Sequence, residues 1–226
     1  MKIVIFDMDG TLIDSKKDIT ISINYIRDLH YNLSPLSEEF VVKSINMKER
    51  NLPNLFYGTK SYHKKDKDLF EVHYAKQCTK NPYLYEGIRE MLEKLINLGV
   101  KISLATNAPT PFALIMLKHL GVDAMFDLII GSDKVRASKP DPEMINEVLN
   151  HYKFDKTRDE AWMLGDSSKD IDSARNAGIN SVFVTWGFSK ESSHSLVIDE
   201  PKEIFDKTWY VLAKTTGNPD YLHSIV

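Results

Sequence analysis

Between residues 100 and 198 the chain alternates short apolar runs with segments that have the apolar spacing of helices. Six apolar runs have the composition of buried strands: KIVIF at residues 2–6, then VKISLAT, FDLIIGS, AWMLGD, NSVFVTWG and the shorter SLVID. The later strand patterns are preceded or separated by helical patterns at 87–98, 110–120, 141–152 and 170–177. Such alternation is typical of βαβ units. The sequence therefore predicts an α/β fold with a Rossmann-like parallel sheet as its core.

Residues 15–81 have no strand pattern and interrupt the alternation directly after the first strand. Helices are expected over 17–33, where one face carries Ile19, Ile23, Ile26, Leu29 and Leu33, and over about 37–48 and 66–79. The basic stretch NLPNLFYGTKSYHKKDK is expected to be a loop. We predict a core at 1–14 and 82–206, a helical insertion at 15–81 hinged at both ends, and a tail at 207–226 with no clear pattern.

Composition argues against several classes of protein. The formal net charge is -3 without a block of like charge, so a general nucleic-acid surface is not expected. No apolar stretch is long enough to span a bilayer, and the N-terminal run, broken by Asp7, lacks a signal-peptide cleavage site. Cys78 is the only cysteine, so no disulfide can form within the chain. We expect a cytoplasmic monomer or homodimer that binds neither nucleic acid nor membrane.

Polar side chains follow four of the expected strands at the point where each strand ends. The carboxyl ends of parallel strands lie on one edge of a sheet, and open sheets bind ligands there. Each residue alone has an ordinary interpretation as a helix cap, a turn former or a solvated side chain. Their joint position favours one site, made of Asp7, Asp9, Thr106, Asn107, Lys139, Asp166 and Asp170.

Several carboxylates at one apolar sheet edge would repel one another unless a cation lies between them. Magnesium prefers oxygen ligands, whereas zinc and copper favour histidine or thiolate, which these loops lack. Lys139 suits a point-charge partner for a phosphate, and Thr106 with the backbone N–H groups near Asn107 could donate hydrogen bonds to it. A metal site needs only one of the first two acids, so Asp9 is a candidate for proton transfer.

Four segments of the chain resemble, in their order, the four motifs of the haloacid dehalogenase superfamily. They are DMDGTLIDS, TN, SKPDP and GDSSKDIDSARNAG. The insertion after the first motif is similar to the helical cap of that superfamily. The segments VTWG and IDEPKEI are similar to its phosphoglycolate phosphatase-like branch. The resemblance implies a magnesium-dependent phosphatase acting on a small phosphorylated metabolite, such as phosphoglycolate, a sugar phosphate or a nucleotide.

The same resemblance implies a role for each residue. Asp7 would attack phosphorus to form an aspartyl-phosphate, and Asp9 would protonate the leaving group and later activate water. The phosphoryl oxygens would be held by Thr106, the Asn107 backbone and Lys139. The metal ligands would be the side chains of Asp7 and Asp166 and the backbone carbonyl of Asp9, with Asp170 in the metal shell or orienting Lys139.

Substrate selection is expected in the insertion, because a closing cap can exclude water and contact the leaving group. Lys48 and Arg50 could reach an anionic leaving group, although a solvated helix end is the simpler interpretation. The stretch VVKSINMKERNLP lacks the mid-cap glycine that related caps often carry, which argues against phosphoglycolate itself but not against phosphate chemistry.

Two other hypotheses stay open. A phosphomutase, phosphonate hydrolase or dehalogenase would share the fold. A dehalogenase would not need the second acid, so the presence of Asp9 together with Lys139 argues against it. A non-catalytic binding module is the third hypothesis, and the complete set of charged residues argues against it.

Overall fold

The computed structural model describes residues 1–47, 50–189, 193–194 and 196–207. Within these residues a parallel sheet has the strand order β5-β4-β1-β6-β7-β8. Its strands are β1 (Lys2–Phe6), β4 (Lys101–Ala105), β5 (Leu128–Ile130), β6 (Glu160–Gly165), β7 (Asn180–Val184) and β8 (Val197–Ile198). The α/β fold with a parallel sheet, predicted from the alternation of strands and helices, is confirmed.

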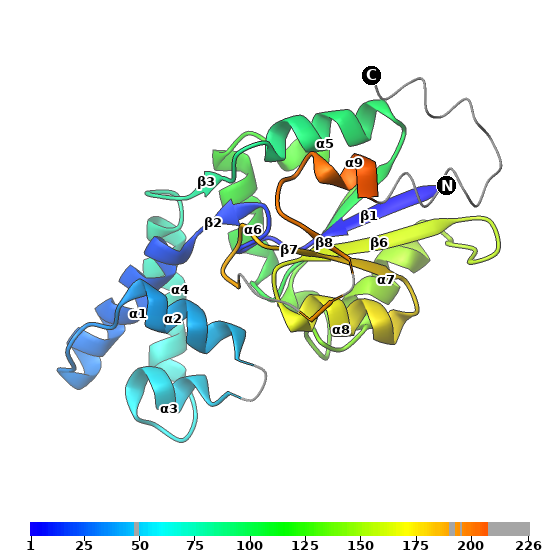
Figure 1. Cartoon of the computed structure of the whole chain (residues 1–226). Helices are drawn as coiled ribbons and strands as arrows, with labels where there is room; N and C mark the ends of the chain where they lie inside the picture. Colours follow the sequence, from blue (N-terminus) through cyan, green and yellow to red (C-terminus); the bar gives the residue numbers. More distant parts are fainter. Residues whose placement is uncertain (48–49, 190–192, 195, 208–226) are drawn as a thin grey trace.

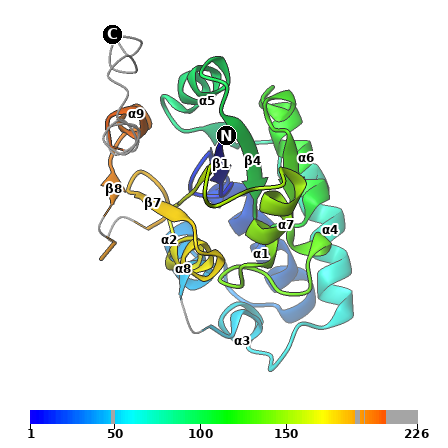
Figure 2. The ribbon, with the colours of Figure 1, turned by 90° about the vertical axis from the view of Figure 1, so that its right-hand side faces the viewer.

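Helices cover both faces of the sheet, as the side chains of β1 show. Val4 and Phe6 join an apolar cluster with α5 (Ile88–Asn97) and α6 (Thr110–His119). Ile3 and Ile5 point the other way and join a cluster with α7 (Glu143–His151) and α8 (Ser168–Ala177). Figure 2 shows α5 and α8 on opposite sides of the strands. Burial on both faces explains why β1 is a continuous apolar run, since neither face needs polar residues.

Four helices follow β1 and gather at the end of the sheet away from the N-terminus (Figure 1). They share a separate apolar cluster built on Ile23, Ile26, Val41, Phe56 and Tyr57. We call them the helical insertion; they are α1 (Lys16–Tyr31), α2 (Glu38–Asn46), α3 (Leu52–Tyr57) and α4 (Lys64–Gln77). None of the helices in the described part of the chain is both long and apolar enough to cross a membrane.

Two short strands, which the sequence pattern did not indicate, join the connections to the helical insertion. β2 (Ile13–Asp14) pairs antiparallel with β3 (Tyr83–Leu84). Close by, the buried Asp18 carboxylate accepts hydrogen bonds from the backbone and the side chain of Asn81. The chain therefore leaves and re-enters the core at neighbouring points. The domain boundaries at 14/15 and 81/82 stay predictions.

Local expectations were wrong at three places. The expected loop contains α3, because the Asn51 side chain caps its first turn and Pro53 stands where a proline is tolerated. Leu29 and Leu33, expected on the buried face of the first helix, are 57% and 38% exposed, and Leu33 lies beyond the end of that helix, which stops at Tyr31 with Asn32 in the left-handed conformation. A short helix, α9 (Glu203–Lys207), was not predicted, and the tail beyond it lies outside the described residues.

Candidate active site

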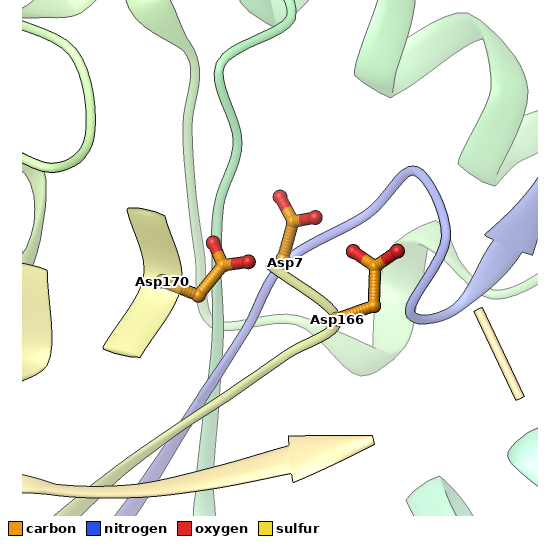
Figure 3. Close-up of side chains that lie close together, drawn as sticks. All are labelled: Asp7, Asp166 and Asp170. Atoms are coloured by element: carbon orange, nitrogen blue, oxygen red, sulfur yellow. The ribbon is translucent and has the colours of Figure 1, made fainter. Parts of the chain in front are cut away.

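Three buried carboxylates lie together at the carboxyl edge of the sheet. Asp7 follows β1, Asp166 follows β6 and Asp170 lies in the first turn of α8. One carboxylate oxygen of each lies within 4.8 Å of the others, and Figure 3 shows the three side chains grouped around a common space. The strands cause this arrangement, because β1 and β6 are parallel neighbours with Phe6 opposite Leu164, so the residues that follow them meet.

The turn after Asp7 needs a glycine. Gly10 has a φ of 85°, in the left-handed region that side chains disfavour. A Cβ at this position would also overlap the Asp166 carboxylate. The turn is closed by the Met8 carbonyl, which accepts hydrogen bonds from the N–H groups of Leu12 and Ile13 at 2.9 and 3.0 Å. The DMDGT segment therefore folds back beside the carboxylates.

Lys139 supplies positive charge to this cluster. Its buried Nζ donates hydrogen bonds to Asp7 at 2.7 Å and to Asp170 at 2.6 Å. Burial lowers the pKa of Lys139 because it favours the neutral amine. The charges of Asp170 and Asp7 outweigh this effect and raise the pKa of Lys139 above its ordinary value. Lys139 is therefore a fixed cation beside the carboxylates.

Asn107 holds the Lys139 backbone in place. Its Oδ1 accepts a hydrogen bond from the Lys139 N–H, and its Nδ2 donates one to the Lys139 carbonyl, both at 3.0 Å. From the sequence, only the Asn107 backbone was assigned a role, toward phosphate. The structure adds this positioning role for the side chain, which no local sequence pattern indicates.

The cluster carries more negative charge than Lys139 neutralises. Burial, followed by the charges of Asp7 and Asp170, raises the pKa of Asp166 well above its ordinary value, although the N–H groups of Phe188 and Ser189 donate to its carboxylate. Burial also raises the pKa of Asp7, despite the opposing charge of Lys139. Three oxygen donors in such a place fit a hard divalent cation, which would favour the ionised carboxylates.

Asp9 lies apart from this carboxylate cluster but in the same pocket. The Ser15 hydroxyl donates a hydrogen bond to its carboxylate. Burial raises the pKa of Asp9 to about 6, against the opposing effects of Ser15 and Lys139. Its carboxyl therefore keeps its proton closer to neutral pH than an ordinary aspartate does.

A pocket of about 260 Å³ brings the predicted residues together. It lies between the sheet edge and the helical insertion, which contributes apolar side chains such as Ile19, Leu52 and Phe70. Arg50 also lines it, while Lys48 lies outside the described residues. Thr106 is buried in its wall, where its hydroxyl accepts a hydrogen bond from the Ala108 N–H. The core residues lining it are Asp7, Asp9, Thr106, Asn107, Lys139, Asp166 and Asp170.

Sequence reasoning missed Lys169, which also lines the pocket. Its Nζ donates a 2.8 Å hydrogen bond to the Ile45 carbonyl at the end of α2, so it joins the core to the helical insertion. Burial, and then the charge of Arg50, lower the pKa of Lys169 to about 8. Its position beside Asp170 in the GDSSKD motif is a weak signal, because the side chains of consecutive helix residues point in different directions.

The sequence model of haloacid dehalogenase-like hydrolases matches residues 4–184 of this chain. The chain belongs to the haloacid dehalogenase-like hydrolase family. A phosphoglycolate phosphatase of Pectobacterium atrosepticum is 31% identical over 89% of this chain and 87% of the relative. The N-acetylmuramic acid 6-phosphate phosphatase of Pseudomonas aeruginosa is 28% identical over 91% of this chain and 94% of the relative.

A solved structure supports the same assignment. It is described as a predicted phosphoglycolate phosphatase from Haemophilus somnus 129pt and matches with a TM-score of 0.78 and 25% identity, over 92% of this chain and 98% of that chain. The expected membership of the phosphoglycolate phosphatase-like branch is confirmed, and the chain is an enzyme of this hydrolase family.

Proposed function

We propose that this protein is a magnesium-dependent phosphatase that hydrolyses a small phosphorylated metabolite through an aspartyl-phosphate on Asp7. The observation that supports this proposal most strongly is the buried cluster of Asp7, Asp166 and Asp170 with Lys139 in one pocket. Its charged oxygens suit magnesium, and its lysine suits a phosphoryl group. The cation would be held by the Asp7 and Asp166 side chains and the Asp9 carbonyl, and would neutralise phosphoryl charge when bound.

The residues of the chain divide the reaction between them. Asp7 stands at the end of the central strand β1, with its carboxylate in the pocket, where it can attack the phosphorus of a bound ester. Lys139 would move part of its contact from Asp7 to the phosphoryl oxygens, while Asp170 keeps the amine in place. Thr106 and the Asn107 backbone would complete the phosphate site. Most of the rate enhancement would then come from positioning and charge neutralisation.

Asp9 is the proposed acid and base. Its pKa of about 6 keeps more of its carboxyl protonated near neutral pH than in an ordinary aspartate, which suits proton donation to the leaving oxygen. After the alcohol leaves, the resulting carboxylate can accept a proton from the water that hydrolyses the aspartyl-phosphate. Since Asp7 and Asp9 are two residues apart and line the same pocket, one can attack while the other serves the leaving group.

The relatives support the substrate class. Their names give phosphoglycolate and N-acetylmuramic acid 6-phosphate as substrates, so we propose a small phosphate monoester here as well. A cytoplasmic location and a monomeric or homodimeric state stay proposals from the sequence.

Phosphate release from a panel of sugar phosphates, short phosphorylated acids and nucleotides tests the proposal. With magnesium we expect release from several esters, and chelation should reduce it at least about 100-fold because the metal neutralises phosphoryl charge. Circular dichroism in the chelator serves as the control for folding, and added magnesium should restore the rate. Rates that do not change on chelation, or no release from any ester by the folded protein, would contradict it.

A further inference from the structure

We propose that the preferred phosphate ester carries an uncharged apolar group, about the size of one aromatic ring, on its alcohol part, and that this group binds in a second cavity beside the catalytic pocket. The inference rests on the proposed function and adds a substrate class to it. We call the second cavity the apolar chamber. Its volume is about 270 Å³, and it is lined by the helical insertion and by the start of α6.

The apolar chamber adjoins the catalytic pocket, because six side chains line both. Each of the four helices of the insertion contributes one of them, and the core contributes two at the start of α6. They are Ile19, Ile45, Leu52, Phe70, Pro109 and Phe112. The catalytic pocket also holds Asp7 and Lys139, so the alcohol part of an ester bound there can extend into the apolar chamber.

The walls of the apolar chamber suit a ring. Ile23, Phe56 and Tyr57 line the chamber and are buried in the apolar cluster of the insertion. Ile19 and Phe70 are only partly buried, and both pack against that cluster and against the cluster of the core. A ring bound here would remove apolar surface from water and could meet the aromatic side chains edge to face. The chamber therefore offers more to an apolar group than to a polar one.

The charged side chains of the apolar chamber do not require a charged ligand. The buried Asp66 carboxylate accepts hydrogen bonds from His30 Nδ1 at 2.6 Å and from the Tyr31 hydroxyl at 2.5 Å. Lys67 and Glu71 are exposed, so water can solvate their charges.

The volume of the apolar chamber fits the same class of ligand. An apolar cavity of about 150 Å³ is enough to bind benzene. At about 270 Å³ the chamber has room for one ring and the atoms that link it to the phosphate.

The test compares 2-phenylethyl phosphate with ethyl phosphate in the presence of magnesium. Both esters release a primary alcohol, and they differ only in the phenyl group. The wild-type kcat/KM should be about 10- to 100-fold higher for the phenylethyl ester, the usual gain from burying a group of this size. Leu52→Trp fills the apolar chamber and should lower the ratio of the two kcat/KM values by about tenfold. Ile45→Phe, on a different helix, should lower it as well, so the test does not depend on the folding of one variant.

Leu114→Trp is the matched control, because it makes the same substitution at a leucine of α6 that is 45% exposed and lines neither cavity. It should leave the ratio unchanged. A purely structural effect would lower both kcat/KM values together, whereas loss of the binding site changes their ratio. Equal wild-type values for the two esters, or an unchanged ratio in folded Leu52→Trp and Ile45→Phe, would overturn the apolar chamber as a substrate site and leave the proposed function intact. A folded wild-type enzyme that hydrolyses no phosphate ester in the presence of magnesium would contradict the proposed function itself.

Discussion

Asp7→Asn should reduce phosphate release by at least about 10⁴-fold, because it removes the carboxylate that attacks phosphorus. The protein should stay folded, since Lys139 keeps its 2.6 Å contact with Asp170. Its thermal stability in a chelator should equal or exceed that of the wild type. The reason is that burial and nearby charge already disfavour the ionised form of Asp7, and the amide removes that charge. Steady-state kinetics and thermal melts measure both effects.

Asp127→Asn is the matched control for this substitution. The Asp127 carboxylate is 44% exposed and lies just before β5, at the opposite edge of the sheet from the pocket. Its loss should change the rate by no more than about twofold, as is usual for surface substitutions. A rate for Asp7→Asn close to that of the wild type would show that Asp7 is not the nucleophile.

Lys139→Met should have the second largest effect, and it should act on both stability and activity. It would leave Asp7 and Asp170 buried without their cation, so the free energy of unfolding in a chelator should fall by about 3–5 kcal/mol. The rate should fall by about 10²–10³-fold, because a charge that stabilises the transferring phosphoryl group is lost. Urea unfolding and phosphate release measure the two effects.

Magnesium should recover part of the lost stability of Lys139→Met, since a divalent cation replaces some of the missing positive charge. Lys134→Met is the control, because Lys134 is 61% exposed and pairs with Asp133 at a weak 3.8 Å. If Lys139→Met unfolded at the same urea concentration as the wild type, the ion pairs of Lys139 could not be what mainly offsets the free-energy cost of burying the Asp7 and Asp170 carboxylates.

The core of the site could be predicted from the sequence because its position follows from strand direction alone. Asp7 and Asp166 come after apolar runs, and parallel strands place such residues on one edge whatever their order. That β1 and β6 are neighbours could not be predicted, because strand order depends on tertiary packing. The role of the Asn107 side chain could not be predicted either, since its partner is 32 residues away.

The helical insertion and its connections were predicted less well than the core. β2 and β3 contain two residues each, which is too short for any periodic pattern. The exposure of Leu29 depends on which neighbouring helices reach it, and helical spacing does not contain that information. Lys169 bonds to the Ile45 carbonyl of α2, and this contact could not be predicted because it depends on where the insertion lies relative to the core.

Diffraction from crystals grown with Mn²⁺ in place of magnesium tests the central claim most directly, because manganese prefers the same oxygen ligands and gives an anomalous signal. We predict one strong anomalous peak about 2.1 Å from a carboxylate oxygen of Asp7 and from one of Asp166. A map with no peak between these two residues, with their carboxylates turned apart, would contradict a divalent cation as the group that stabilises this site.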